Sequence, residues 1–312
     1  MAADAIDAPF EVYRFDPSSD RAPRYASYRL KLPPHTPVLT ALLKIREDLD
    51  PSLTLRYSCR SAICGSCAML INSKSRLACQ TPIGPELERH GRIVIDPMRN
   101  MPIVRDLVTD QRPFWAQYRR IEPHLIEDRA HPLPEGKPSV MTPAQVERFH
   151  ETPRCIACAA CYSACPAVEA DAGFPGPMAL AKLYRFAVDP RDGAHRERLL
   201  KIQPGGLWLC LRCHLCTEAC PKGVRPSERI MDLKEMAIAV QGANEPGSRH
   251  ALAFKENIRE GGVLNERKLV VQTYGVLGLA GQVGQAVRIV RKKPETRQKP
   301  KPIRDLSEVE KL

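Results

Sequence analysis

The 312-residue sequence lacks the patterns that usually mark an active site for an organic substrate. It contains no G-x-G-x-x-G loop for a dinucleotide and no Ser–His–Asp arrangement for acyl transfer. Its eight histidines are scattered, and we expect His214, which lies inside a cysteine-rich segment, to be a surface residue rather than a group supporting the metal ligands. Chemistry on an organic substrate is therefore expected to occur on a partner protein.

The N-terminus also lacks a targeting pattern. The first ten residues, MAADAIDAPF, contain neither the basic n-region nor the apolar h-region of a secretory signal peptide. Residues 269–287 are uncharged, but three Gln and four Gly interrupt their apolar character, which favours an amphipathic or docking segment over a transmembrane helix. We expect a peripheral protein on the cytosolic face of a membrane.

Positive charge is concentrated near the C-terminus. The net charge is +11, and residues 288–304 contain eight Lys or Arg against one Glu. This basic run could bind anionic lipid or could be a solvated tail. It lacks interleaved aromatic residues and a basic domain behind it, so we expect no nucleic-acid partner.

Phenylalanine is scarce, with 7 residues, whereas proline is abundant, with 29, which predicts long connectors between small domains. All 12 cysteines fall into three sets of four with none left over. Disulfides would be unusual without a secretory signal. A structural zinc scaffold is the more serious alternative, because four-cysteine zinc sites also use C-x2-C.

Two segments have the spacing C-x2-C-x2-C-x3-C-P, which is the ligand signature of bacterial-type ferredoxins. The first runs from Cys155 to Pro166 and the second from Cys210 to Pro221. Two-residue gaps let a tight loop place three sulfurs around one cluster, and the fourth Cys binds the other cluster in two-cluster proteins. The pattern predicts two cubane clusters with exchanged fourth ligands.

The remaining cysteines follow the plant-type pattern of a 2Fe–2S loop, C-x4-C-x2-C and a later Cys. They are Cys59, Cys64, Cys67 and Cys79. Small residues around Gly65 allow backbone N–H groups to point at sulfur. Residues 9–31 predict a strand hairpin, Val38, Leu42, Ile45 and Leu49 predict one helix face, and further strands are expected at 68–72, around 76–79 and at 92–96.

The rest of the chain predicts helices. Thr142, Pro143 and Gln145 form a capping-box pattern for a helix that would lead to Cys155. Helices are also expected over 178–189 and from Ser227 to about Val240, with Gly242 as the stop. The predicted class is α+β, with an N-terminal β-grasp domain (1–118), a Pro-rich connector (119–141), an all-α two-cubane domain (142–242) and a C-terminal extension (243–312).

The three cysteine motifs, together with the segment DPMRNMPIVRDLVTD at 96–110, occur in the order found in the iron–sulfur subunit of succinate dehydrogenase and fumarate reductase. The sequence resembles this family over roughly residues 9–241. Within 96–110 we expect a loop and helix anchored by Ile103 and Leu107. The resemblance implies a partner flavoprotein with covalent FAD, a membrane-anchor subunit and quinone as acceptor, with this chain relaying single electrons between them.

The crossed pattern assigns Cys155, Cys158, Cys161 and Cys220 to the first 4Fe–4S cluster and Cys165, Cys210, Cys213 and Cys216 to the second cubane. The family usually lacks a cysteine at the position of Cys213 and carries 3Fe–4S there. Because Cys213 is present, we predict 4Fe–4S, with 3Fe–4S as the alternative.

Two further departures concern the quinone site. The family's usual Trp and His positions are Ala170 and Leu211 here, and Trp208 lies two residues before Cys210. Residues 244–275 resemble the C-terminal part of heterodisulfide-reductase-type iron–sulfur subunits. The alternative function is therefore an iron–sulfur subunit of a related complex, with another flavoprotein, such as a glycolate oxidase, or with a thiol–disulfide partner.

Overall fold

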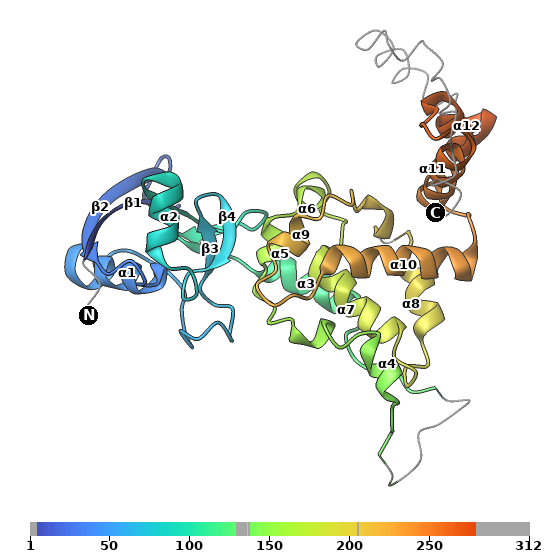
Figure 1. Cartoon of the computed structure of the whole chain (residues 1–312), viewed down its shortest axis with the longest axis horizontal. Coiled ribbons are helices and arrows are strands. Elements are labelled where there is room, and N and C mark those ends of the chain that lie inside the picture. Colours follow the sequence, from blue (N-terminus) through green and yellow to red (C-terminus); the bar gives the residue numbers. More distant parts are fainter. Residues whose placement is uncertain (1–4, 129–135, 137, 205, 279–312) are drawn as a thin grey trace. The chain divides into compact units, whose positions relative to one another are not determined.

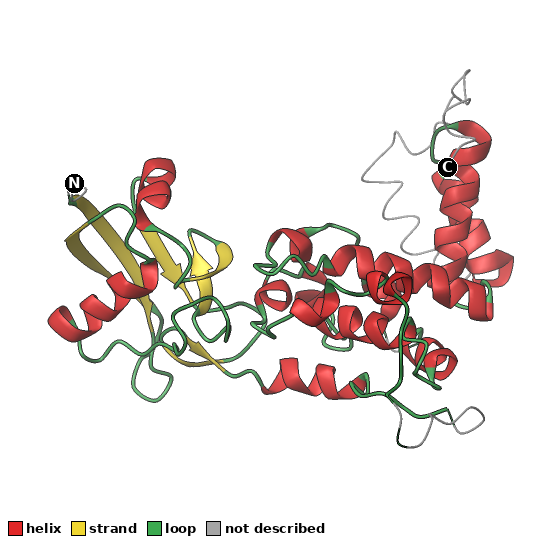
Figure 2. Cartoon of the chain, turned by 60° about the horizontal axis from the view of Figure 1, so that its bottom comes forward, coloured by secondary structure: helices red, strands yellow, loops and turns green. Residues whose placement is uncertain are grey.

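The computed structural model describes residues 5–128, 136, 138–204 and 206–278. The chain forms two compact units, Met1–Leu233 and Lys234–Leu312. The first contains all the strands and most of the helices, coloured blue to orange in Figure 1 and by secondary structure in Figure 2. The basic run at 288–304 and the second half of the uncharged segment lie outside the described residues.

A five-stranded mixed sheet forms the N-terminal part, in the order β2-β1-β5-β3-β4. Its strands are β1 (Ile6–Arg14), β2 (Arg24–Leu32), β3 (Ala68–Ile71), β4 (Lys74–Leu77) and β5 (Ile93–Asp96). Strand β1 is parallel to β5, and the other pairs are antiparallel. Alternate residues of β1, including Phe10 and Val12, are buried, as its period-two pattern requires. The predicted strands and hairpins are confirmed.

Two helices complete the core of this domain. They are α1 (Val38–Lys44), which continues as the π-helical turn η1 (Ile45–Leu49), and α2 (Ile83–His90). Val38, Leu42 and Ile45 are buried, as the predicted face requires. Leu49 is 51% exposed, so its place on that face was wrong. The π turn, closed by Asp50 N–H on the Ile45 carbonyl, shifts the helical period there.

The segment 96–110 differs from its prediction. It forms a two-stranded ribbon of β6 (Ile103–Arg105) and β7 (Val108–Thr109), not a helix, and α3 (Arg112–Arg120) begins after it. β-Branched residues favour strands, and Asp106 adopts the left-handed conformation of a tight turn. Leu107 is buried as predicted, whereas Ile103 is only half-buried.

A buried ion network ties this ribbon to the sheet. Arg14 Nε donates to Asp106 at 3.1 Å, and the same guanidinium donates to Ser52 at 2.7 Å and pairs with Asp50. Asp106 also accepts N–H groups from Phe15 and Thr54. Burial raises the pKa of Asp50, but hydrogen bonds from Ser52, Tyr28 and Arg14 outweigh it and hold that pKa well below its usual range.

Short helices and turns make up the rest of the first unit. They are α4 (Pro143–Glu147), η2 (Thr152–Arg154), α5 (Ala160–Ser163), α6 (Pro166–Ala170), α7 (Pro177–Ala187), α8 (His195–Ile202), η3 (Leu207–Leu209), α9 (Leu215–Glu218) and the first half of α10 (Pro226–Gln241).

The predicted caps and faces of these helices are largely confirmed. Thr142 and Gln145 form the expected capping box. The helix is shorter than expected, however, and the turn η2 rather than α4 leads to Cys155. The predicted apolar faces of α7 and α10 are buried, and Gly242 ends α10 in the left-handed conformation. The prediction that Ser227 caps α10 was wrong, because the helix begins at Pro226 and Ser227 lies within its first turn.

The second unit contains a pair of helices, α11 (Pro246–Gly261) and α12 (Glu266–Gly278), with a kink at Gly275. Polar groups meet between them, since Asn257 donates to Gln272 at 2.7 Å and Arg249 donates to the Thr273 carbonyl at 2.8 Å. Within the described part of the chain, no helix is both long enough and apolar enough to cross a membrane.

Replacement of Arg14 tests the buried network. Arg14→Met leaves the Asp106 carboxylate without its cation, and we expect a loss of about 3 kcal/mol in the free energy of unfolding. The control is Arg29→Met on β2, because the side chains of Arg29 and its partner Asp7 are largely exposed, at 70% and 46%. Denaturant unfolding of the N-terminal domain measures both, and equal losses would contradict the prediction.

Candidate iron–sulfur centres

The first predicted set of cysteines lies in and beside the loop before β3: three of the four belong to the loop, and Cys79 follows β4. Backbone N–H groups of Ser61, Ile63 and Cys64 donate to Cys59 Sγ at 3.4, 3.4 and 3.2 Å, and that of Ala62 donates to Cys79 Sγ at 3.3 Å. The loop folds this way because Arg60, Ala62 and Gly65 have left-handed backbones that turn successive N–H groups inward. Backbone N–H groups of this loop thus point at cysteine sulfurs, whereas the expectation that they point at the sulfides of a bound cluster stays a prediction.

The thiols of this loop have different environments. A hydrogen bond from the Ser66 side chain, followed by backbone N–H bonds, lowers the pKa of the exposed Cys64 to about 6. Burial and its proximity to Cys79 and Cys64 raise the pKa of Cys67 to about 12. Metal binding replaces these protons, because thiolates are the ligands.

The second set surrounds a small cavity in the helical domain. Cys155 and Cys158 line it from the loop that leads into α5, Cys161 lines it from α5 itself, and Cys220 lines it from the segment after α9. Ala157 and Ala159 have left-handed backbones, with φ of 51° and 61°. Met178 of α7 covers part of the same cavity.

The third set repeats this geometry. Cys210, Cys213 and Cys216 line a second cavity together with Cys165, which opens α6. Arg212 and His214 have left-handed backbones, with φ of 56° and 61°, at the positions that match Ala157 and Ala159. His214 is exposed, as predicted, although it borders this cavity. The structure therefore brings together the two crossed sets that the spacing predicts.

The donor sets fit iron–sulfur clusters. All twelve cysteines are free thiols. Burial raises the pKa of Cys158 to about 11 and of Cys216 to about 12, and raises that of Cys161 well above its usual value. Buried thiols facing one another with inward N–H groups favour a bound cationic metal. In the described residues, no three His, Cys, Asp or Glu side chains converge tightly enough for a single ion. A polynuclear cluster spreads its thiolates over several irons.

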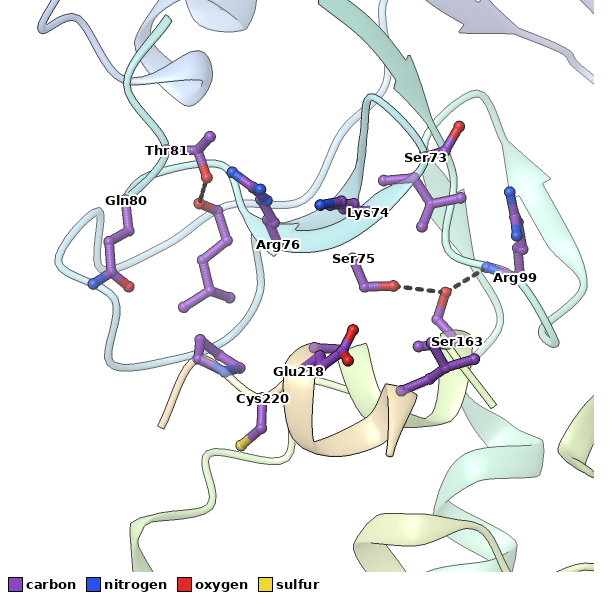
Figure 3. A pocket seen from close by; sticks show the side chains of 16 residues that line it. Ser73, Lys74, Ser75, Arg76, Gln80, Thr81, Arg99, Ser163, Glu218 and Cys220 are labelled. Atoms are coloured by element: carbon purple, nitrogen blue, oxygen red, sulfur yellow. Dashed lines mark hydrogen bonds between the residues drawn. The ribbon is translucent and has the colours of Figure 1, made fainter. Parts of the chain in front are cut away.

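Ser163 connects the sheet domain to α5. Ser75 Oγ of β4 donates to Ser163 Oγ at 3.2 Å, and the Arg99 N–H donates to the same oxygen at 2.9 Å (Figure 3). These contacts border a cavity of about 560 Å³ between β4 and the helices α5 and α9, lined also by Lys74, Glu218 and Cys220.

Asn100 holds the backbone between the two cubane sets. Its amide nitrogen donates to the carbonyl oxygens of Tyr162, Ser163 and Cys165 at 2.8, 3.4 and 3.1 Å. Asn100 has φ of 64°, which Asn tolerates better than most residues. Sequence reasoning missed both Asn100 and Ser163. The only signal was an Asn in a Pro-rich turn, before Met101 and Pro102, which predicts the turn but not its partner.

Comparison with known proteins agrees with this site. Residues 9–116 match the family of 2Fe-2S iron-sulfur cluster binding domains, and residues 151–224 match the 4Fe-4S dicluster domain. Fold and site thus define an iron–sulfur electron-transfer protein with an α+β architecture.

The curated relatives specify the family. The chain is 37% identical to the fumarate reductase iron-sulfur subunit of Haemophilus influenzae, covering 70% of this chain and 89% of that protein. It is 38% identical to the succinate dehydrogenase iron-sulfur subunit of Paracoccus denitrificans, covering 73% and 87%. A chain of the Mycobacterium smegmatis Sdh1 complex superposes with a TM-score of 0.69 at 26% identity, covering 76% and 98%. The protein belongs to the succinate dehydrogenase and fumarate reductase iron–sulfur subunits.

Substitution of Asn100 tests its role. Asn100→Asp keeps the size and the tolerance for a left-handed backbone but removes both donors, so a carboxylate faces three carbonyl oxygens. We expect a loss of about 1–3 kcal/mol in the stability of the helical domain and faster release of iron to a chelator. The control is Asn244→Asp, an exposed Asn that also donates to a carbonyl, that of Gln241. Equal rates of iron release in both variants would contradict this prediction.

Proposed function

We propose that this chain holds three clusters through the three cysteine sets. Cys59, Cys64, Cys67 and Cys79 would bind 2Fe–2S, Cys155, Cys158, Cys161 and Cys220 would bind 4Fe–4S, and Cys165, Cys210, Cys213 and Cys216 would bind the second cubane. Bound iron–sulfur clusters accept and release single electrons with little rearrangement. The chain's own residues hold the sulfurs, donate N–H hydrogen bonds to them and limit the access of water to the buried thiols.

The two exposed cysteines support two separate docking surfaces for redox partners. Of the twelve cysteines, Cys64 and Cys213 are exposed, one in the first set and one in the third. Each lies beside an exposed apolar side chain, since Ile63 and Leu211 are both 65% exposed. Leu209 and Leu215, which lie close to Leu211 in the sequence, are also exposed. Exposed apolar groups at the edges of two redox sites favour docking of two redox partners.

We assign one proposed partner to each of these two surfaces. The relatives are subunits of succinate dehydrogenase or fumarate reductase. We assign the surface at Ile63 to a flavoprotein subunit with FAD and the surface at Leu211 to a membrane-anchor subunit or quinone, which places the chain peripherally on the cytoplasmic face of the membrane. The single observation that carries this proposal is the pair of exposed cysteines, Cys64 in the first set and Cys213 in the third.

A second candidate keeps the electron relay but changes the partners. Position 170, at the end of α6, is Ala, and the exposed position 211 is Leu. Neither residue therefore supplies the aromatic or histidine group that is usual near quinone. This favours a related flavoprotein or heterodisulfide-reductase-like complex. The two functions are separated by purification of the native complex, identification of its subunits and an EPR redox titration. Zinc without acid-labile sulfide would overturn both and support a structural scaffold.

The proposed domain bounds remain those of the sequence: a 2Fe–2S domain over 1–118, a connector over 119–141, a two-cubane domain over 142–242 and an extension from 243. The matched families, at 9–116 and 151–224, support the first and third of these.

Cys213 determines the type of the third cluster. With Cys213 present we expect 4Fe–4S, and we expect Cys213→Ser to give a stoichiometric 3Fe–4S signal in the EPR spectrum of the oxidised protein. Arg212→Ala is the control, because it alters the same exposed turn without removing a thiol. A full three-iron signal in the unmodified protein would contradict the prediction.

The two docking surfaces are separable. We expect Ile63→Lys to weaken binding of the flavoprotein subunit at least about 10-fold while sparing the anchor, because a buried apolar contact worth about 1.5 kcal/mol is lost. Leu211→Lys should do the reverse. Co-purification with each subunit and the iron content of both variants are the measurements. Loss of the same partner in both variants would refute the assignment of the two ends.

A further inference from the structure

Gly65 lies where the 2Fe–2S loop touches the first cubane loop. A Cβ added at Gly65 would lie 2.8 Å from Cys158 Cβ, 3.0 Å from Cys158 Cα and 3.2 Å from the Ile156 carbonyl oxygen. Ile156 and Cys158 also pack against the core of the sheet domain. The two loops are thus in contact, backbone against backbone, at the point where the proposed cysteine sets approach each other.

Backbone conformation alone does not explain a glycine here. Gly65 has φ of 76°, but Arg60 and Ala62 adopt φ of 57° and 55° in the same loop while carrying side chains. Among the other described glycines with left-handed backbones, Gly91 and Gly223 have nothing within 4 Å of an added Cβ. Space, rather than φ, therefore distinguishes Gly65 within its loop.

The contact cannot adjust as a flexible side chain would. The atoms facing Gly65 belong to the backbone and Cβ of a proposed cluster ligand and to a backbone carbonyl. Ordinary carbon–carbon contact would require the loops to separate by about 1 Å. The hydrogen bonds of Ser163 with Ser75 and Arg99 hold the same two domains together at a second place, so the loops themselves must take up the movement.

We infer that Gly65 is a positioning residue whose missing side chain sets the separation between the 2Fe–2S loop and the first cubane loop. This inference rests on the proposed ligand sets. Both the rate of electron transfer between two redox groups and their magnetic coupling fall steeply with distance. A side chain at position 65 therefore weakens communication between the first two sets without removing a ligand.

The test compares Gly65→Ala with Gly91→Ala in the intact, cluster-loaded complex. Gly91 has φ of 70°, so its variant carries the same kind of backbone strain without a steric clash. Iron, sulfide and EPR spin quantitation first establish that each variant is loaded. The readouts are the enhancement of 2Fe–2S spin relaxation by the reduced cubane and the rate of electron equilibration after flash photoreduction.

We expect Gly65→Ala to retain its clusters and to show a several-fold lower relaxation enhancement and a slower equilibration, with Gly91→Ala unchanged. Wild-type coupling in a fully loaded Gly65→Ala overturns the inference. Absence of clusters from the unmodified complex would instead overturn the proposed ligand sets.

A second variant keeps the inference testable if Gly65→Ala loses its 2Fe–2S cluster. Combining it with Ala62→Gly gives the loop more backbone freedom, so that it can move while keeping its ligands. A restored cluster with weak coupling supports the inference, and a restored cluster with wild-type coupling overturns it. Loss of the cluster in both variants also counts against it, because Gly65 would then be needed for the fold of the loop rather than for its spacing.

Discussion

The exchange of cysteines between the two cubane loops is the constraint on which the helical domain depends. Cys161 lies in the short helix α5 and Cys165 follows that helix, so these two thiols face different cavities, and Cys216 in α9 and Cys220 after it are placed in the same way. Each loop therefore completes the site of the other. Neither set of four thiols can form until both loops and the helices between them are folded, which couples metal binding to the folding of the whole domain.

The same short helix links this exchange to the sheet domain. Ser163, at the end of α5, accepts hydrogen bonds from β4 and from Arg99, and Asn100 holds the three carbonyls around it. The residues that direct Cys161 and Cys165 into separate cavities thus also fix the loops against the plant-type domain. One turn of helix thus carries contacts both within the helical domain and with the sheet domain.

Much of this could be predicted from sequence because the signals are local. Cysteine spacing predicts the sets, period-two alternation predicts β1 and β2, and the capping box at Thr142 predicts the start of α4. The failures lie where distant contacts decide. The exposure of Leu49 depends on a π turn. The ribbon that begins at Ile103–Arg105 depends on the pairing of Asp106 with Arg14. Asn100 donates to carbonyl oxygens more than 60 residues away in the sequence. The periodicity of a sequence does not predict such distant partners.

The two ends of the relay differ in a way that suits different partners. At the first set a single exposed Ile63 stands beside Arg60, whose guanidinium lies over the Tyr57 ring at 5.4 Å. At the third set Leu211 borders the same cavity as Cys213 and is exposed, and the chain segment around it also carries the exposed Leu209, Arg212, His214 and Leu215. Charge favours rapid, oriented encounter, whereas a larger apolar surface is typical of permanent interfaces. The segment at the third set carries more exposed apolar side chains than the segment at the first, which supports the proposed attachment there, and it is also where Leu211 and Cys213 depart from the family pattern. Both departures therefore lie at one surface, which supports the proposal that a different anchor docks there.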